Sequence, residues 1–196
     1  MRGLVIGHSF VSGLSDHFSS QISHSLTPSR TASLLQVSNV VEHITLYGIR
    51  GACVLPSFSL PLTYLSTHSP HFVIIDLGTN DIAQGTDPLN VAMALLELAQ
   101  TLCSLYSVKH VFICSVLFRA DTRASSKINQ NIFRLNGYLK NLCQIENNIW
   151  YWRHKGFWAT DPLQWSRDGL HPNSTRGRKL YKTSLRSAIF KAAGKA

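Results

Sequence analysis

The sequence predicts an α/β protein with a five-stranded parallel sheet and helices on both faces of that sheet. Three observations lead to this prediction: five short apolar segments, helical spacing of apolar residues between them, and a length of 196 residues, which fits one domain. Continuous apolar segments are typical of buried parallel strands, and right-handed crossovers place the connecting helices on both faces. The predicted strands are residues 4–7, 44–47, 72–77, 111–116 and 149–152.

Helical spacing is clearest after Pro88. Asp87 and Pro88 supply an N-cap and a first helical residue. The apolar stripe of this helix consists of Val91, Leu95, Leu98, Leu102 and Leu105. A second stripe lies within residues 129–143, and a third helix closes the chain. Segment 10–40 is rich in Ser and His and contains Pro28, so we expect one helix followed by irregular chain there.

The composition is that of an ordinary globular protein, with 44% hydrophobic and 15% charged residues. No continuous apolar run is long enough to span a bilayer, and the first residues lack the apolar core of a secretory signal. The four cysteines are widely spaced and form no CxxC pair. Reduced thiols and an intracellular, cytoplasmic location are therefore expected, although a domain cut from a secreted parent would look the same.

The net charge of +9 has a strong local component, because residues 176–196 contain seven Lys or Arg and no acid. One interpretation is a solvated final helix that keeps the protein in solution. The other is attraction to an anionic partner, either nucleic acid or an anionic lipid surface. Charge alone does not separate these two interpretations.

Three unusual loops begin where predicted strands end. Such loops converge at the carboxyl edge of a parallel sheet, where ligand sites lie. Taken alone, Ser9 favours a helix N-cap, and the Thr-Asn-Asp that includes Asn80 is good turn chemistry. Alternatively, Ser9 is a nucleophile at a helix start, and the Asn80 amide and the Gly51 N–H are donors to an oxyanion. The loops are residues 7–9, 48–51 and 78–81.

Asp168 lies three residues before His171. An Asp at this spacing can accept the Nδ1–H of the His and leave Nε2 as a base, as in a Ser-His-Asp triad. The alternative is a loop that caps the final helix, with Pro172 at the helix start and His171 exposed. Each motif alone favours the simpler interpretation. Together they place a nucleophile, a base, an orienting acid and oxyanion donors at one edge of the sheet, which predicts acyl transfer.

These blocks resemble the ordered blocks of the SGNH (GDSL-type) hydrolase family. The most specific parts are Gly-Thr-Asn-Asp at residues 78–81 and Asp-x-x-His-Pro-Asn at 168–173, and the similarity spans residues 5–177. The resemblance implies a flavodoxin-like, three-layer αβα fold. It also implies a serine esterase that needs no metal or other cofactor. The usual substrates of the family are esters, including lipid, thioester and acetylated-sugar substrates.

The resemblance also assigns roles to individual residues. It implies that Ser9 is the nucleophile, His171 the base and Asp168 its partner. The backbone N–H groups of Ser9 and Gly51 and the side chain of Asn80 would form the oxyanion hole.

The chain departs from the family pattern at His8, where the family usually has Asp or Asn. An imidazole can also donate a hydrogen bond, but it is bulkier and titrates near neutrality. We interpret His8 as a structural variant rather than a second base, with loss of activity as the alternative. Val11 occupies the last position of a Gly-x-Ser-x-Gly elbow, so an α/β-hydrolase fold is disfavoured.

A narrower resemblance concerns compact, basic SGNH domains without a secretion signal. The chain is similar to the esterase domain in the first open-reading-frame protein of certain non-LTR retrotransposons of the L2 and CR1 type. The first strand begins almost at Met1, so we expect residues 1–196 to be one domain cut from a longer polypeptide. Other domains of the longer polypeptide would then contribute to RNA binding and self-association. The resemblance also implies membrane lipids as substrates of the esterase domain.

The functional prediction is a hydrolase of short acyl or lipid esters. Two alternatives remain: a weakly active or inactive module that binds RNA or an anionic membrane, and a carbohydrate acetylesterase. The polar loop 119–127 is either a lid over the site or an ordinary exposed loop. His68 and His71 form no convincing metal site, and we expect no metal.

Overall fold

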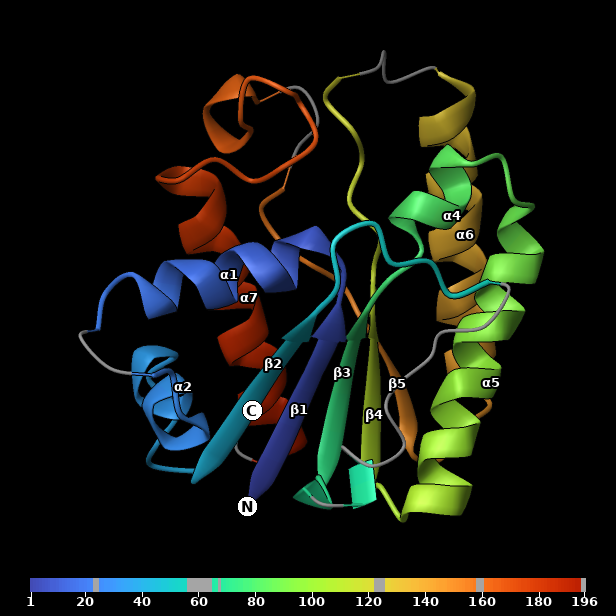
Figure 1. Cartoon of the computed structure of the whole chain (residues 1–196). Coiled ribbons are helices and arrows are strands. Elements are labelled where there is room, and N and C mark those ends of the chain that lie inside the picture. The colour runs from blue at the N-terminus through green and yellow to red at the C-terminus, as the bar shows by residue number, and fades with distance from the viewer. Residues whose placement is uncertain (23–24, 56–64, 67, 122–125, 158–160, 195–196) are drawn as a thin grey trace.

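The computed structural model describes residues 1–22, 25–55, 65–66, 68–121, 126–157 and 161–194. Five parallel strands form one sheet in the order β2-β1-β3-β4-β5, as Figure 1 shows. This is the flavodoxin-like order, in which the direction of winding reverses between β1 and β3. The predicted fold is confirmed. The strands are β1 (Arg2–Gly7), β2 (His43–Gly48), β3 (Phe72–Asp76), β4 (His110–Cys114) and β5 (Ile149–Trp152).

Helices cover both faces of the sheet and complete three layers (Figure 1). One face packs against α5 (Pro88–Tyr106) and α6 (Lys127–Cys143). The other packs against α1 (Ser9–Ser19), α2 (Pro28–Leu34) and α7 (Arg176–Ala192). Side chains alternate between these two cores along each strand because successive residues of a strand point to opposite faces.

Helix α5 begins at the predicted cap. The Asp87 side chain accepts the backbone N–H groups of Leu89 and Asn90. With 19 residues and a mean hydropathy of 1.3, α5 meets the length and composition of a membrane span. Its buried stripe, which includes Val91 and Leu95, nevertheless packs in the core formed with α6 and the sheet. Core helices of globular proteins meet the same criteria, and we describe α5 as one of them.

The prediction of one helix and then irregular chain for residues 10–40 is wrong, because two helices form. The first, α1, buries an amphipathic face. The second, α2, begins at Pro28, with the Thr27 hydroxyl accepting the N–H of Arg30. Proline at the first helical position is favourable because the N–H that it lacks would have no intrahelical partner there. Pro28 therefore starts a helix instead of preventing one.

Two glycines bring α1 onto the ends of the strands. A Cβ atom on Gly7 would collide with the Val11 side chain, and one on Gly48 would collide with the backbone of Ser12. The absence of side chains at these two positions therefore lets the first turn of α1 lie directly above β1 and β2. The residues that follow β1 are held at the carboxyl edge of the sheet as a result.

Candidate active site

Ser9 is the first residue of α1, and His8 is the N-cap. The interpretation of Ser9 as a helix N-cap is wrong, because the N-cap position is occupied by His8 and Ser9 is already helical. Instead, Ser9 Oγ lies 2.9 Å from His171 Nε2, across 162 residues of chain. The first backbone N–H groups of a helix lack intrahelical acceptors and form the positive end of its dipole. Ser9 Oγ therefore lies where negative charge is favoured.

Asp168 fixes the His171 ring from its other side. Asp168 Oδ2 lies 2.6 Å from His171 Nδ1, and Asp168 Oδ1 accepts the backbone N–H groups of Leu170 and His171 at 2.9 and 3.0 Å. Partial burial raises the pKa of Asp168, but the hydrogen bonds from His171 and Leu170 outweigh this effect and lower the pKa to about 2. Asp168 is therefore ionised at neutral pH and orients the imidazole.

The loop that carries this pair is closed by its own backbone. Ser166 N–H donates to His171 O at 2.7 Å, and Gly169 N–H donates to Ser166 O at 2.9 Å. Asn173 follows the pair, and its Oδ1 accepts Gly177 N–H in the first turn of α7 at 2.9 Å. The capping role that we considered for this loop belongs to Asn173, which leaves His171 directed at Ser9.

The loop after β2 is bound to the short helix α4 (Thr79–Ala83). Asn80 Nδ2 donates one hydrogen to Ala52 O at 2.8 Å, and the amide keeps a second N–H. The buried Asp81 carboxyl accepts the N–H groups of Val54 and Leu55. Gly51 has a φ of +73°, which glycine adopts at little cost. The structure thus joins the loops of Gly51 and Asn80.

His8 is 2% exposed, and its Nδ1 lies 3.4 Å from Ser9 Oγ. Its Nε2 faces Asp76 Oδ1 at 3.7 Å. Burial and, to a smaller extent, the charge of His171 lower the pKa of His8 to about 3, against an opposite effect of Asp81. Asp76 also accepts a short hydrogen bond from Tyr181. The sequence analysis missed Asp76 and Tyr181; the one available signal was an acid inside the apolar segment 72–77.

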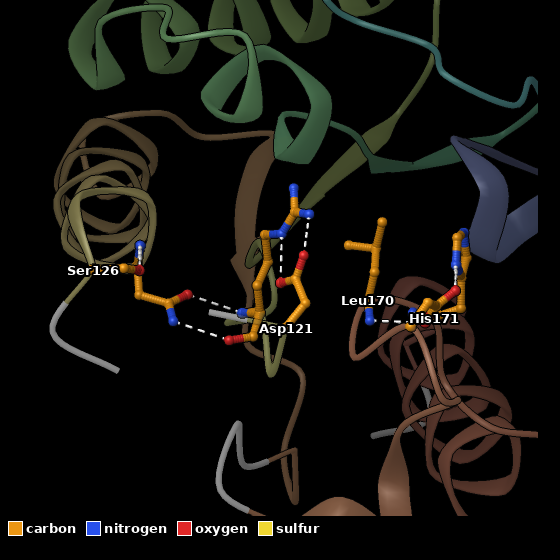
Figure 2. Close-up of polar contacts among 7 residues, drawn as sticks. Asp121, Ser126, Leu170 and His171 are labelled. Atoms are coloured by element: carbon orange, nitrogen blue, oxygen red, sulfur yellow. Dashed lines mark hydrogen bonds and ion pairs between the residues drawn. The ribbon is translucent and has the colours of Figure 1, made fainter. Parts of the chain in front are cut away.

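The loop after β4 contacts the loop of Asp168 and His171 directly. The backbone N–H groups of Ala120 and Asp121 both donate to Gly169 O, at 2.8 and 3.1 Å. Arg119 pairs with Asp121, and Figure 2 shows this ion pair beside the segment of Leu170 and His171. Over residues 119–121 this segment, for which the sequence left open a lid or an ordinary exposed loop, braces the loop of His171. Residues 122–125 lie outside the described part of the chain.

Two asparagines of α6 hold the loop after β4. Asn136 accepts the N–H of Val116 at 2.9 Å and donates to its C=O at 2.8 Å. Asn129 makes the same pair of bonds to Arg119, both at 2.9 Å (Figure 2). These asparagines are seven residues apart, so they lie on the same face of the helix. The sequence analysis missed them, although polar residues beside an apolar stripe are a usable signal.

A cavity of about 170 Å³ opens beside Ser9. Its lining includes Ser9, Phe10 and Leu14 from α1, His171, and Arg178 from α7. Drug-sized ligand pockets usually measure about 300–1,000 Å³, so this cavity is small. Among the residues that the structure describes, no group of three or more His, Cys, Asp or Glu side chains is placed to hold a metal ion.

Solved structures share this fold. One is a GDSL-like lipase from Bacteroides thetaiotaomicron, with 21% sequence identity, a TM-score of 0.67, and coverage of 97% of this chain and 88% of that chain. Another is an acetylxylan esterase from Geobacillus stearothermophilus, with 16% identity, a TM-score of 0.65, and coverage of 100% and 94%. At such identities the likeness shows the fold alone.

Sequence comparison identifies the family. No curated protein sequence matches the chain at a significant level. A model of the GDSL-like Lipase/Acylhydrolase family, however, matches residues 5–175. The matched stretch contains Ser9, Asp168 and His171, and it covers most of the chain. The chain therefore belongs to the GDSL-like lipase/acylhydrolase family of ester hydrolases.

Proposed function

We propose that this protein is a serine esterase that hydrolyses carboxylic esters through an acyl-enzyme. One observation carries the proposal: Ser9 Oγ lies 2.9 Å from His171 Nε2, while His171 Nδ1 lies 2.6 Å from Asp168 Oδ2. Nucleophile, base and orienting acid are thus within hydrogen-bond reach of one another, which is the geometry that activates a serine.

The first half-reaction acylates Ser9. His171 Nε2 takes the hydroxyl proton as Ser9 Oγ bonds to the ester carbonyl carbon, and the carbonyl oxygen becomes an oxyanion. In this proposal the backbone N–H groups of Ser9 and Gly51 and the remaining N–H of the Asn80 amide stabilise that charge. The tetrahedral intermediate then collapses, and the alcohol leaves with the proton from His171.

The second half-reaction restores the enzyme. His171 takes a proton from water, the hydroxide oxygen bonds to the acyl carbon, and Ser9 Oγ leaves with the proton that His171 returns. Asp168 stays ionised throughout, because its hydrogen bonds keep its pKa at about 2. The carboxylate can therefore stabilise the imidazolium that forms in both halves.

The small cavity supports short acyl groups as substrates. A volume of about 170 Å³ accommodates an acetyl or butyryl group, whereas a long acyl chain would have to extend beyond it. Phe10 and Leu14 supply the apolar part of its wall. Hydrolysis of p-nitrophenyl esters from acetate to decanoate tests this preference, and kcat/KM should fall as the chain outgrows the cavity.

The decisive experiment combines activity with covalent labelling. Wild-type protein should hydrolyse p-nitrophenyl acetate or butyrate, and a fluorophosphonate probe should label Ser9. Ser9→Ala should abolish both signals, while Ser19→Ala, at an exposed position of the same helix, should keep both. The proposal fails if wild-type protein is inactive and unlabelled, or if Ser9→Ala leaves the activity intact.

A carbohydrate acetylesterase is a second candidate within the same chemistry. The fold shared with an acetylxylan esterase and the small cavity beside Ser9 both favour acetyl esters. Rates of hydrolysis of acetylated xylan and acetylated oligosaccharides, compared with those of short-chain glycerol esters, test this candidate. If the carbohydrate panel is inert while the glycerol esters react, the lipid-type assignment stands and the carbohydrate assignment is dismissed.

The cations of α7 support an additional binding role. Of its six Lys and Arg residues, Arg176 pairs with Asp161 at 3.4 Å, and no other α7 cation pairs with a carboxylate of the described residues. We propose that α7 attracts a phosphate-rich surface, which fits the narrower retrotransposon resemblance. Binding to anionic vesicles and to single-stranded RNA should weaken with salt and survive Ser9→Ala. Absent or salt-independent binding to both would refute this role.

A further inference from the structure

A buried polar cluster lies beneath Ser9, and the proposed reaction does not use it. Its members come from four parts of the fold: the β1–α1 junction, the end of β3, the residues after β5, and α7. All of them are buried, with exposures of 7% or less. Such a cluster would be costly unless its hydrogens and lone pairs matched. The members are His8, Asp76, His154, Tyr181 and Ser184.

The direction of the Ser9 hydroxyl hydrogen determines which tautomer of His8 can form a hydrogen bond with Ser9 Oγ. His171 Nδ1–H donates to the ionised Asp168, so Nε2 of the neutral ring holds a lone pair and accepts the Ser9 hydroxyl hydrogen. Ser9 Oγ then presents only lone pairs to His8 Nδ1, 3.4 Å away. A hydrogen bond between these two atoms therefore requires the hydrogen of His8 to be on Nδ1.

The second nitrogen of His8 then constrains Asp76. Burial lowers the pKa of His8 to about 3, so the ring is neutral and its Nε2 holds a lone pair. That lone pair faces Asp76 Oδ1 at 3.7 Å. A carboxylate oxygen would repel it, whereas a protonated Oδ1 would attract it. Burial raises the pKa of Asp76, against smaller opposite effects of His154 and Tyr181, and this favours the protonated form.

The remaining contacts of Asp76 agree with a proton on Oδ1. Tyr181 donates its hydroxyl hydrogen to Asp76 Oδ2. Ser184 Oγ accepts Trp152 Nε1–H at 3.1 Å, which leaves its own hydrogen for His154 Nδ1 at 2.8 Å. The hydrogen of His154 is then on Nε2, which faces Asp76 Oδ2 at 3.8 Å. Oδ2 thus faces two donors, and Oδ1 is the oxygen free to carry the proton.

We propose that His8 is a positioning residue that donates Nδ1–H to Ser9 Oγ, and that neutral Asp76 holds His8 in this tautomer. The inference rests on the proposed esterase function. When His171 removes the serine proton, Oγ gains negative charge, and the His8 donor stabilises that charge and keeps the oxygen in place. The 3.4 Å separation is long for the resting enzyme and shortens as the charge develops.

His8 cannot replace His171 as the base in this arrangement. Its Nδ1 already carries a hydrogen, so it has no lone pair for the Ser9 proton. Positive charge on His171 also disfavours a second proton on His8. The other groups that face His8 are His154, Asp81 and the Phe10 ring, and only Asp81 favours a second proton. The neutral imidazole of His8 can therefore lie beside Ser9 while His171 alone acts as the base.

The first test reads the tautomer directly. Two-bond ¹H–¹⁵N spectra of the imidazoles distinguish a protonated nitrogen from an unprotonated one, and His8→Asn assigns the signal. The proposal expects His8 to be neutral with the hydrogen on Nδ1 from about pH 5 to about pH 8. Asp76→Asn should keep this tautomer, because its amide N–H₂ can donate to Nε2. A hydrogen on Nε2, or a charged ring, in the wild-type protein would overturn the proposal.

The second test compares two amides at position 8. The amide of His8→Asn can place a donor near the former Nδ1, whereas the longer side chain of His8→Gln places it near the former Nε2. Loss of one hydrogen bond should lower kcat of His8→Gln roughly two- to ten-fold relative to His8→Asn. Equal kcat values for the two variants would refute the inference. Equal melting temperatures of the two variants would show that a difference in kcat does not come from a difference in folding stability.

The two tests separate this inference from the proposed function. A wild-type protein that neither reacts with fluorophosphonate nor hydrolyses esters refutes the esterase, and with it the positioning role. An active, labelled wild-type protein with a hydrogen on His8 Nε2 refutes only the role of His8.

Discussion

Two His–Asp pairs flank the same serine oxygen, and their surroundings are opposite. Beside the cavity, the side chains of His171 and Asp168 are 39% and 50% exposed and lie 2.6 Å apart. Beneath the serine, the side chains of His8 and Asp76 are 2% and 4% exposed and lie 3.7 Å apart. The pKa of Asp168 is lowered to about 2, whereas burial raises that of Asp76. The two carboxyl groups thus have pKa values shifted in opposite directions.

The difference shows how burial and hydrogen bonds select the base. Water and two backbone N–H groups stabilise the charge on Asp168, so this carboxylate can support an imidazolium at His171. Asp76 lacks such solvation, and the neutral form is favoured there. A pair that stays neutral can orient the serine without competing for its proton. Geometry alone, with both rings near Ser9 Oγ, would not distinguish the two histidines.

The largest expected effect comes from the exposed pair. His171→Gln should lower kcat by about 10⁴- to 10⁶-fold, because in the proposed tautomer His8 Nδ1 carries a hydrogen and cannot accept the Ser9 proton in place of His171. His8→Gln, which lacks a donor at the former Nδ1, should cost about tenfold or less, the value of one hydrogen bond. Initial rates with p-nitrophenyl acetate measure both. Comparable losses in the two variants would contradict the assignment of a single base.

Asp168→Asn should have the next largest effect, a loss of about 10⁴-fold in kcat. The backbone N–H groups of Leu170 and His171 keep the carbonyl oxygen at the Oδ1 position, so the new N–H₂ group faces His171 Nδ1. His171 must then carry its hydrogen on Nε2 and cannot accept the Ser9 proton. Asp76→Asn preserves every hydrogen-bond donor that the buried pair needs, so kcat of this variant should fall by less than about tenfold. A larger loss at Asp76 than at Asp168 would reverse the comparison.

Gly169→Ala should misplace the exposed pair without removing it. Gly169 has a φ of +65°, and a Cβ atom there would collide with the backbone of Asp121. Because a displacement of about 1 Å can cost about 10²-fold, kcat should fall ten- to a hundred-fold. The matched control is Gly137→Ala in α6, where a Cβ atom meets nothing within 4 Å. It should keep its activity and gain about 0.5–1 kcal/mol of stability. Equal rates for the two variants would contradict the bracing role of this contact.

The exposed pair could be predicted from sequence because its parts are local. Asp168 and His171 lie three residues apart, and the apolar strands place their loop and that of Ser9 at one edge of the sheet. The five strands were predictable for the same reason, since each is a continuous apolar run. The helix at Pro28 was missed because Pro was read as an interruption, although it also suits the first turn of a helix.

The buried pair could not be predicted in this way. Tyr181 reaches Asp76 across 105 residues, and only the packing of α7 on the sheet brings them together. The sequence shows His8 as a departure from a family pattern, but it does not show whether the ring is exposed or buried. The protonation of the pair depends on that burial. The spacing of Asn129 and Asn136, in contrast, could have indicated their shared face in α6.

The last prediction concerns stability instead of catalytic rate, and it isolates the buried histidine. The pKa of His8 is about 3 in the folded protein against 6.5 in a model peptide. Between these values the unfolded chain binds a proton that the folded protein excludes, so the free energy of unfolding falls as the pH decreases. One such proton contributes a slope of about 1.4 kcal/mol per pH unit. His8→Asn should remove this contribution.

Urea unfolding of the two proteins between about pH 4 and about pH 6.5 measures that slope. Asp76 acts in the opposite sense, because its raised pKa means that the folded protein keeps a proton that the unfolded chain loses above 3.8. This second contribution is present in both proteins, so the difference between them reports His8. Parallel pH profiles would mean that His8 carries a charge in the folded protein, and the contrast between the two pairs would then be wrong. A flatter profile for His8→Asn would show that burial keeps this imidazole neutral beside the nucleophile.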